Sequence, residues 1–165
     1  MPPFPVAASF ITTLTQRVAN ALIATDETLL SVKLPPGILR NIGDTLFFMA
    51  ANTCAANANN KTSKVTFGNS ALPVAGITFT SNGTPTTNYG WITKRGPNQQ
   101  SCVGITFQGL AGGSLDRLTD LTEDENTPLQ VKLIGSSDVA AGDIESRLLQ
   151  VIYIPAGSQF GFGAF

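Results

Sequence analysis

The sequence predicts an all-β protein, with about eight short antiparallel strands folded into one sandwich or barrel. Apolar and polar residues alternate over segments of strand length, and turn sequences rich in Gly, Pro or Asn separate these segments. Charged residues make up only 13% of the 165 residues, and Thr, Asn, Ser, Gly and Pro take their place. These residues favour strands and turns over helices. A chain of this length also buries a core without help from metals or disulfides.

The predicted strands are separated by recognisable turns. Leu30, Val32 and Leu34 alternate with polar residues until Pro35-Pro36-Gly37 ends the first strand. The residues Arg95–Asn98 turn one predicted hairpin, the Asn-rich stretch Asn52–Asn60 is a loop or hairpin tip, and Gly109–Asn126 is the longest break. The other predicted strands are Thr45–Ala51, Lys64–Gly68, Ala75–Thr80, Tyr89–Lys94, Cys102–Gln108, Leu129–Ile134 and Ser146–Ile154.

Both ends of the chain are predicted to be arms flanking a sandwich domain of residues 26–155. The N-terminal arm, residues 1–25, has three prolines in its first five residues, yet Phe4, Val6 and Phe10 are too apolar for a free tail. A helix over Leu14–Ile23 places apolar residues on one face, although Phe10–Thr15 reads equally well as a strand.

The C-terminal arm, residues 156–165, carries Phe160, Phe162 and Phe165 among glycines. So short a segment cannot form a core of its own, and three exposed Phe side chains would invite aggregation. The arm therefore either folds back over its own sandwich or docks on another chain. We predict that these residues, with Phe4, Val6 and Phe10, lie in an interface between molecules.

The residue types exclude several classes of function. Histidine is absent, which removes the usual catalytic triads, the usual zinc ligands and the commonest general base. The net charge of −1 without a basic stretch argues against nucleic-acid binding. No apolar run reaches the length of a membrane span, and the N-terminus does not resemble a secretion signal. Cys54 and Cys102 could form a single disulfide, but in an unsecreted protein two cysteines are more often a pair of buried thiols.

An acidic cluster lies within the longest break between predicted strands. Its carboxylates could form a calcium site with loop carbonyls, but the spacing lacks the regular ligands and closing Glu of a calcium loop. We therefore expect a solvated loop, and neither a metal nor a cofactor. The cluster comprises Asp116, Asp120, Glu123, Asp124 and Glu125.

Two further groups have both a structural and a functional interpretation. Asp44 and Asp143 could serve paired-carboxylate glycosidase chemistry, but each flanks a Gly before a strand, where Asp usually holds a turn. Trp91, beside Tyr89, could stack on a sugar, although a single aromatic residue within a strand more often belongs to the core. We expect the structural role in each case and no catalytic residues.

Three short motifs resemble the small jelly-roll proteins of tailed bacteriophage particles. The first is Leu34–Leu39 followed by Gly43-Asp44-Thr45-Leu46, the second is Asn57–Lys61 leading into Thr62–Gly68, and the third is Asp143-Ile144 before the terminal strand. The resemblance covers about residues 27–154. It implies an all-β, jelly-roll-type sandwich with extended N- and C-terminal arms.

The same resemblance implies a capsid decoration or cement protein without enzymatic activity. Such a protein assembles in the host cytoplasm and remains in the virion, where a dimer or trimer of it bridges subunits of the major capsid protein. The alternative is a receptor- or carbohydrate-binding module of a head fibre or tail, with Trp91, Tyr89 and the Asn52–Asn60 loop as the candidate site.

Overall fold

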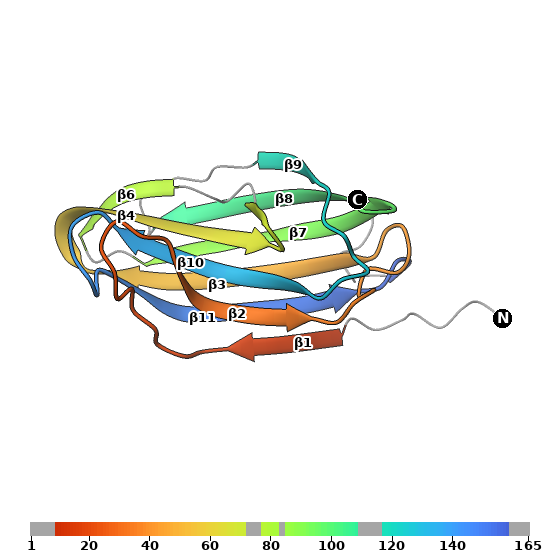
Figure 1. Cartoon of the computed structure of the whole chain (residues 1–165), viewed down its shortest axis with the longest axis horizontal. Helices are drawn as coiled ribbons and strands as arrows, with labels where there is room; N and C mark the ends of the chain where they lie inside the picture. The colour runs from red at the N-terminus through yellow and green to blue at the C-terminus, as the bar shows by residue number, and fades with distance from the viewer. Residues whose placement is uncertain (1–8, 72–76, 83–84, 109–116, 159–165) are drawn as a thin grey trace, which may run out of the picture.

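The fold is a sandwich of two antiparallel β-sheets, and it confirms the all-β prediction. The computed structural model describes residues 9–71, 77–82, 85–108 and 117–158. Strands of both sheets run in nearly the same direction, as expected for aligned sheet packing (Figure 1). The strands are β1 (Ser9–Leu14), β2 (Glu27–Leu34), β3 (Thr45–Cys54), β4 (Ala56–Phe67), β5 (Ser70–Ala71), β6 (Ile77–Asn82), β7 (Thr86–Gly96), β8 (Gln99–Gln108), β9 (Arg117–Leu121), β10 (Leu129–Ser137) and β11 (Ile144–Ile154).

The larger sheet has six strands in the order β1-β11-β3-β7-β8-β9. The smaller sheet has the order β2-β10-β4-β5, with β6 also paired to β4. The chain passes between the sheets at Ala55, the single residue separating β3 from β4. This arrangement establishes a β-sandwich, whereas the jelly-roll connectivity expected from the sequence is not confirmed. In the described residues no helix is long and apolar enough to cross a membrane.

Of the two alternatives for this segment, the strand over Phe10–Thr15 is confirmed as β1, and the helix over Leu14–Ile23 is wrong. Residues 9–14 form β1, which pairs with β11 at the edge of the larger sheet. The following residues bond to distant parts of the chain instead of to their own preceding turn: the Val18 amide donates to Ser146 Oγ at 2.9 Å, and the Asn20 amide donates to the Ile144 carbonyl at 3.0 Å. These long-range bonds replace the local ones that a helix needs.

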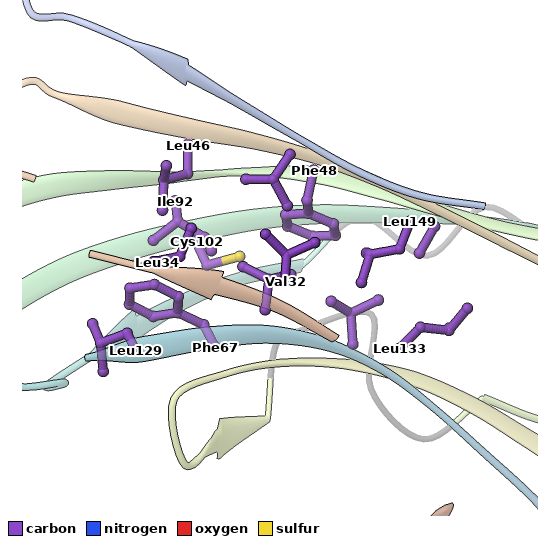
Figure 2. Packing of buried hydrophobic residues seen from close by; sticks show 14 of the residues in the cluster. Val32, Leu34, Leu46, Phe48, Phe67, Ile92, Cys102, Leu129, Leu133 and Leu149 are labelled. Carbon is purple, nitrogen blue, oxygen red and sulfur yellow. The ribbon is translucent and has the colours of Figure 1, made fainter. Parts of the chain in front are cut away.

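The apolar core lies between the two sheets. Side chains from the inner face of the larger sheet meet those from the smaller sheet, and Figure 2 shows Phe48 and Ile92 on one side with Phe67 and Leu129 on the other. The ring of Phe48 packs over Gly90, where an added Cβ would lie 2.9 Å from Phe48 Cζ and 2.2 Å from a backbone oxygen. Gly90 therefore leaves the space that this ring occupies.

Both cysteines are free and buried, which confirms the expectation from the sequence. Burial raises the pKa of Cys54 to about 11 and that of Cys102 to about 12. Because the thiolate is the reactive form, we expect neither residue to react with a thiol reagent at pH 8 in the folded protein. Titration with Ellman's reagent should find both thiols only after unfolding in guanidinium, and rapid labelling of the native protein would contradict this placement.

Candidate interaction face

The outer face of the larger sheet has a centre without charged residues. Directly paired residues of an antiparallel sheet point to the same side, and the registers of β11, β3, β7 and β8 align four residues from each strand on this outer face. All of them are half-buried or exposed. We call this set the aromatic face; it consists of Leu148, Gln150, Ile152, Ile154, Thr45, Phe47, Met49, Ala51, Thr87, Tyr89, Trp91, Thr93, Ser101, Val103, Ile105 and Phe107.

Four rings form a connected row across the middle of the aromatic face. Tyr89 stacks on Phe107 with ring centroids 5.4 Å apart, and it contacts Trp91 in a T-shaped arrangement with centroids 6.2 Å apart. Trp91 in turn contacts Phe47 at 5.5 Å in a tilted arrangement. These mutual contacts fix the rings in place, so the surface that they present is preorganised.

Among the side chains that the structure describes, the most exposed apolar ones of this sheet lie within this face. Trp91 is 37% exposed, Val103 39% and Phe107 37%. The expectation that Trp91 belongs to the core is wrong, because its register partner in β3 is the outward Phe47, whereas the neighbouring Ile92 points inward and is fully buried.

The outer face of the smaller sheet has the opposite character. Its β2, β10 and β4 each contribute a lysine, Lys33, Lys132 and Lys64, and most of its other outward residues are Thr, Ser or Gln. Lys64 forms an ion pair with Asp26. This is the usual composition of a sheet face in contact with water. The sandwich therefore has one face suited to solvent and one suited to a partner.

Ion pairs border the aromatic face at both ends of its strands. Arg95 lies 3.8 Å from Asp120 beyond one end. At the other end, Arg147 pairs with Glu145 at 3.2 Å and donates to Thr53 Oγ1 at 2.9 Å. An apolar centre enriched in aromatic residues and surrounded by a polar rim is the usual organisation of a protein interface.

The expectation of a solvated acidic loop is wrong for two of its members. Glu123 accepts hydrogen bonds from the Asn69 and Ser70 amides at 3.0 and 2.7 Å, and the Ser70 hydroxyl also donates to it. Glu125 is 3% exposed and forms an ion pair with Lys94. The two carboxylates thus join the segment between β9 and β10 to the β4–β5 turn and to β7. Among the described residues no cluster of acidic or Cys side chains is arranged to hold a metal ion, and Asp116 lies outside them.

Asp44 holds a turn, as predicted. Its carboxylate accepts from the Arg40 and Asn41 amides, both at 2.8 Å, and from the Ala156 amide at 2.8 Å. Burial alone would raise the pKa of Asp44, but these bonds and one from Tyr153 outweigh it and lower the pKa below its usual value.

Asp143 anchors the corner where the chain passes between the sheets. It accepts from Asn57 Nδ2 at 2.8 Å, Asn59 Nδ2 at 2.7 Å and Ser137 Oγ at 2.8 Å. Asp44 precedes β3, and Asp143 precedes β11, which runs antiparallel to β3 along its whole length. Ten strand residues therefore separate the two carboxylates by about 30 Å, too far for the paired carboxylates of a glycosidase.

The interior next to Asp143 is polar. Lys61 is fully buried, and its ammonium donates to the carbonyl oxygens of Asn57 and Asn59 at 3.1 and 2.9 Å. A series of side-chain hydrogen bonds also lies between the sheets. Thr106 donates to Asn88 at 2.7 Å, Asn88 donates to Ser63 at 3.0 Å, and Ser63 donates to Asn52 at 3.0 Å. The prediction of a loop or hairpin tip at Asn52–Asn60 is wrong, because this stretch is the end of β3 and the start of β4, joined at Ala55. Asn52, Asn57 and Asn59 hold the interior together, whereas Asn60 is exposed.

The residues predicted to lie in an interface are only partly described. Phe10 belongs to β1 and pairs with Ile152 of β11, at the side of the aromatic face. Phe4, Val6, Phe160, Phe162 and Phe165 lie outside the described residues.

Comparison with known proteins does not place this chain in a family. No family model matches the chain, and no curated protein is a significant match. The class that the fold and the aromatic face define is a two-sheet β-sandwich with one outer face whose centre carries no charged residue.

Proposed function

We propose that this chain is a non-enzymatic structural protein of a bacteriophage particle, which decorates the capsid and bridges subunits of the major capsid protein. The observation that supports the proposal most is the contrast between the two outer faces. An apolar face built of rigid aromatic side chains suits a protein partner, since charged residues are depleted from the centres of interfaces. The resemblance of the sequence motifs to small virion proteins supports the choice of the capsid as that partner.

The avidity of several weak contacts would hold such a protein on the capsid. Each copy contributes one apolar face and the apolar segments at its two chain ends, and an oligomer multiplies these contacts through their high effective concentration. The arm residues Phe160, Phe162 and Phe165 are proposed to contribute to the contact between molecules, together with Phe4, Val6 and Phe10. The protein would then remain in the virion after assembly in the host cytoplasm.

A lysine in the aromatic face tests this function. We expect Val103→Lys to abolish cosedimentation with capsids that lack the native protein, because association would bury an unpaired charge. Thr28→Lys places the same charge on an exposed position of β2, on the opposite face, and should bind as the wild-type protein does. Wild-type binding by Val103→Lys, with its fold confirmed by circular dichroism, would contradict the proposal.

The exposure of Trp91 also favours a second candidate function, carbohydrate binding by a fibre or tail module. The exposed Trp91 ring and the half-buried Tyr89 ring could stack on a sugar, and the hydroxyls of Thr93 and Thr87 beside them could form hydrogen bonds with it. A glycan array separates the two functions, because specific binding that disappears in Trp91→Ala would support the carbohydrate-binding module. Absence of glycan binding together with capsid binding would support the decoration protein.

A further inference from the structure

We propose that the corner around Asp143 is a site of self-modification, at which Lys61 forms an isopeptide bond with the side chain of Asn57 and ammonia is released. Such a reaction needs an amine nucleophile, a carboxamide in contact with it, and a group that transfers protons beside the carboxamide. Lys61, Asn57 and Asp143 supply these three groups in one hydrogen-bonded cluster. The inference goes beyond the proposed function and does not depend on the identity of the partner.

The amine belongs to Lys61, which is fully buried between the sheets. Its Nζ donates to Asn57 Oδ1 at 2.5 Å and to the backbone carbonyls of Asn57 and Asn59 at 3.1 and 2.9 Å. These bonds direct the long side chain back along its own strand and hold the amine in one position. Fixing a nucleophile against its target in this way lowers the entropic part of a reaction barrier.

The Asn57 carboxamide lies within reach of this amine. Because a C=O bond is about 1.2 Å long, Nζ is at most about 3.7 Å from Cγ, the atom that it attacks. Reactants in near-attack geometry lie about 3–3.5 Å apart. The proximity comes from an irregularity in β4. In a regular strand, residues four apart are separated by about 13 Å, whereas the register of β4 against β6 is interrupted between Ala56 and Asn60.

Asp143 is the group that transfers protons. It is 4% exposed, and its Oδ1 accepts a hydrogen bond at 2.8 Å from Asn57 Nδ2, the nitrogen that leaves. A general acid acts from about 2.6–3.2 Å on the atom that it protonates. Its Oδ2 accepts from Asn59 Nδ2 and Ser137 Oγ at 2.7 and 2.8 Å. These two bonds do not involve the reacting atoms, so they hold the carboxylate in place before and after the reaction.

The reaction balances without an oxidant. The Lys61 ammonium gives one proton to the Asp143 carboxylate, and the neutral amine attacks Cγ of Asn57 to form the new C–N bond. Asp143 passes this proton to Nδ2 as the Cγ–Nδ2 bond breaks. The second proton that Nζ loses leaves with the ammonia as ammonium, and Asp143 is again a carboxylate. The new bond closes a ring at the start of β4, next to Ala55, where the chain passes between the sheets.

Mass spectrometry of the full chain tests the inference. We expect the intact protein to be lighter than its sequence by one ammonia, about 17 Da. Trypsin should not cleave after the acylated Lys61, so residues 41–64 should appear as one peptide with the same loss. Lys61→Arg and Asn57→Ala should each have the full mass of their sequences. The matched variants Lys64→Arg and Asn60→Ala, on the same strand, should keep the loss of ammonia.

A succinimide at Asn57 would also release ammonia, but its formation does not need the amine of Lys61. A loss of ammonia that survives in Lys61→Arg would therefore overturn the inference, and so would a wild-type chain of full mass. Asp143→Asn keeps an oxygen acceptor but cannot carry the proton, so it should have full mass; a linked Asp143→Asn would overturn the role of Asp143.

Near-ultraviolet circular dichroism verifies the fold of each variant. The wild-type protein decides the question even where a variant does not fold, because the fragment spectrum of the 41–64 peptide locates the link between Asn57 and Lys61 or shows that it is absent. None of these results bears on binding to the capsid, so this inference and the proposed function can fail separately.

Discussion

Replacing Phe48 by alanine should lower the free energy of unfolding by about 3–5 kcal/mol, the largest loss expected from one residue of the apolar core. Phe48 is fully buried at the centre of the sandwich, where its ring lies over Gly90. The ring cannot be replaced by its neighbours, because the backbone of β7 and β8 forms the floor of the space that it fills. Truncation therefore leaves a cavity, and the cost includes both the lost burial and the lost contacts.

The adjacent Phe47 is a matched control. It has the same side chain in the same strand, but it points to the aromatic face and is only half-buried. Phe47→Ala should cost about 1 kcal/mol. Urea unfolding followed by far-ultraviolet circular dichroism measures both variants at a concentration where the wild type is monomeric. Equal losses for the two variants would contradict the assignment of Phe48 to the inside and Phe47 to the outside.

Replacing Asp143 by alanine should destabilise the protein by about 3–5 kcal/mol for a different reason. The substitution leaves Asn57, Asn59 and Ser137 without their common acceptor, and it removes the carboxylate whose charge balances the fully buried Lys61. Asp138→Ala, an exposed carboxylate at the end of β10, should change the stability by about 0.5 kcal/mol or less. A loss of that small size in Asp143→Ala would show that the corner between the sheets does not depend on this residue.

The same carboxylate makes the stability depend on pH. Burial would raise the pKa of Asp143, but bonds from Asn59, Asn57 and Ser137 and the charge of Lys61 outweigh it, so the pKa is lowered from 3.8. A carboxylate with a lowered pKa in the folded state stabilises the protein above its unfolded pKa, and this contribution is lost as the pH falls through the folded value. Asp143→Ala should therefore lose less stability than the wild type between about pH 4 and pH 2.

The alternation of apolar and polar residues along the chain was sufficient to predict the all-β fold class. Leu30, Val32 and Leu34 are buried as their spacing indicates, and Val65 and Phe67 point inward. The helix over Leu14–Ile23 was predicted from local periodicity alone, and no local pattern reveals that Val18 and Asn20 bond to residues more than a hundred positions away. Pairings of this range depend on the tertiary arrangement of the strands.

The aromatic face was partly visible in the sequence. The stretch Thr45–Ala51 is apolar at nearly every position, and so indicates a strand covered on both faces. One covered face is the core, and the other is the aromatic face. The identity of the residues opposite Phe47 depends on the register of β7, which the sequence does not reveal. The burial of Glu123 and Glu125 was also hidden, because their partners come from β7, β8 and the β4–β5 hairpin.

Hydroxyl-radical footprinting of Trp91 in the free monomer and in the assembled state tests the central claim most directly. The account predicts that oxidation of Trp91 falls strongly on assembly, because a partner covers the aromatic face. Ile42 and Val139, which are 68% and 56% exposed on loops away from that face, should be oxidised equally in both states. Equal oxidation of Trp91 in both states would contradict the account.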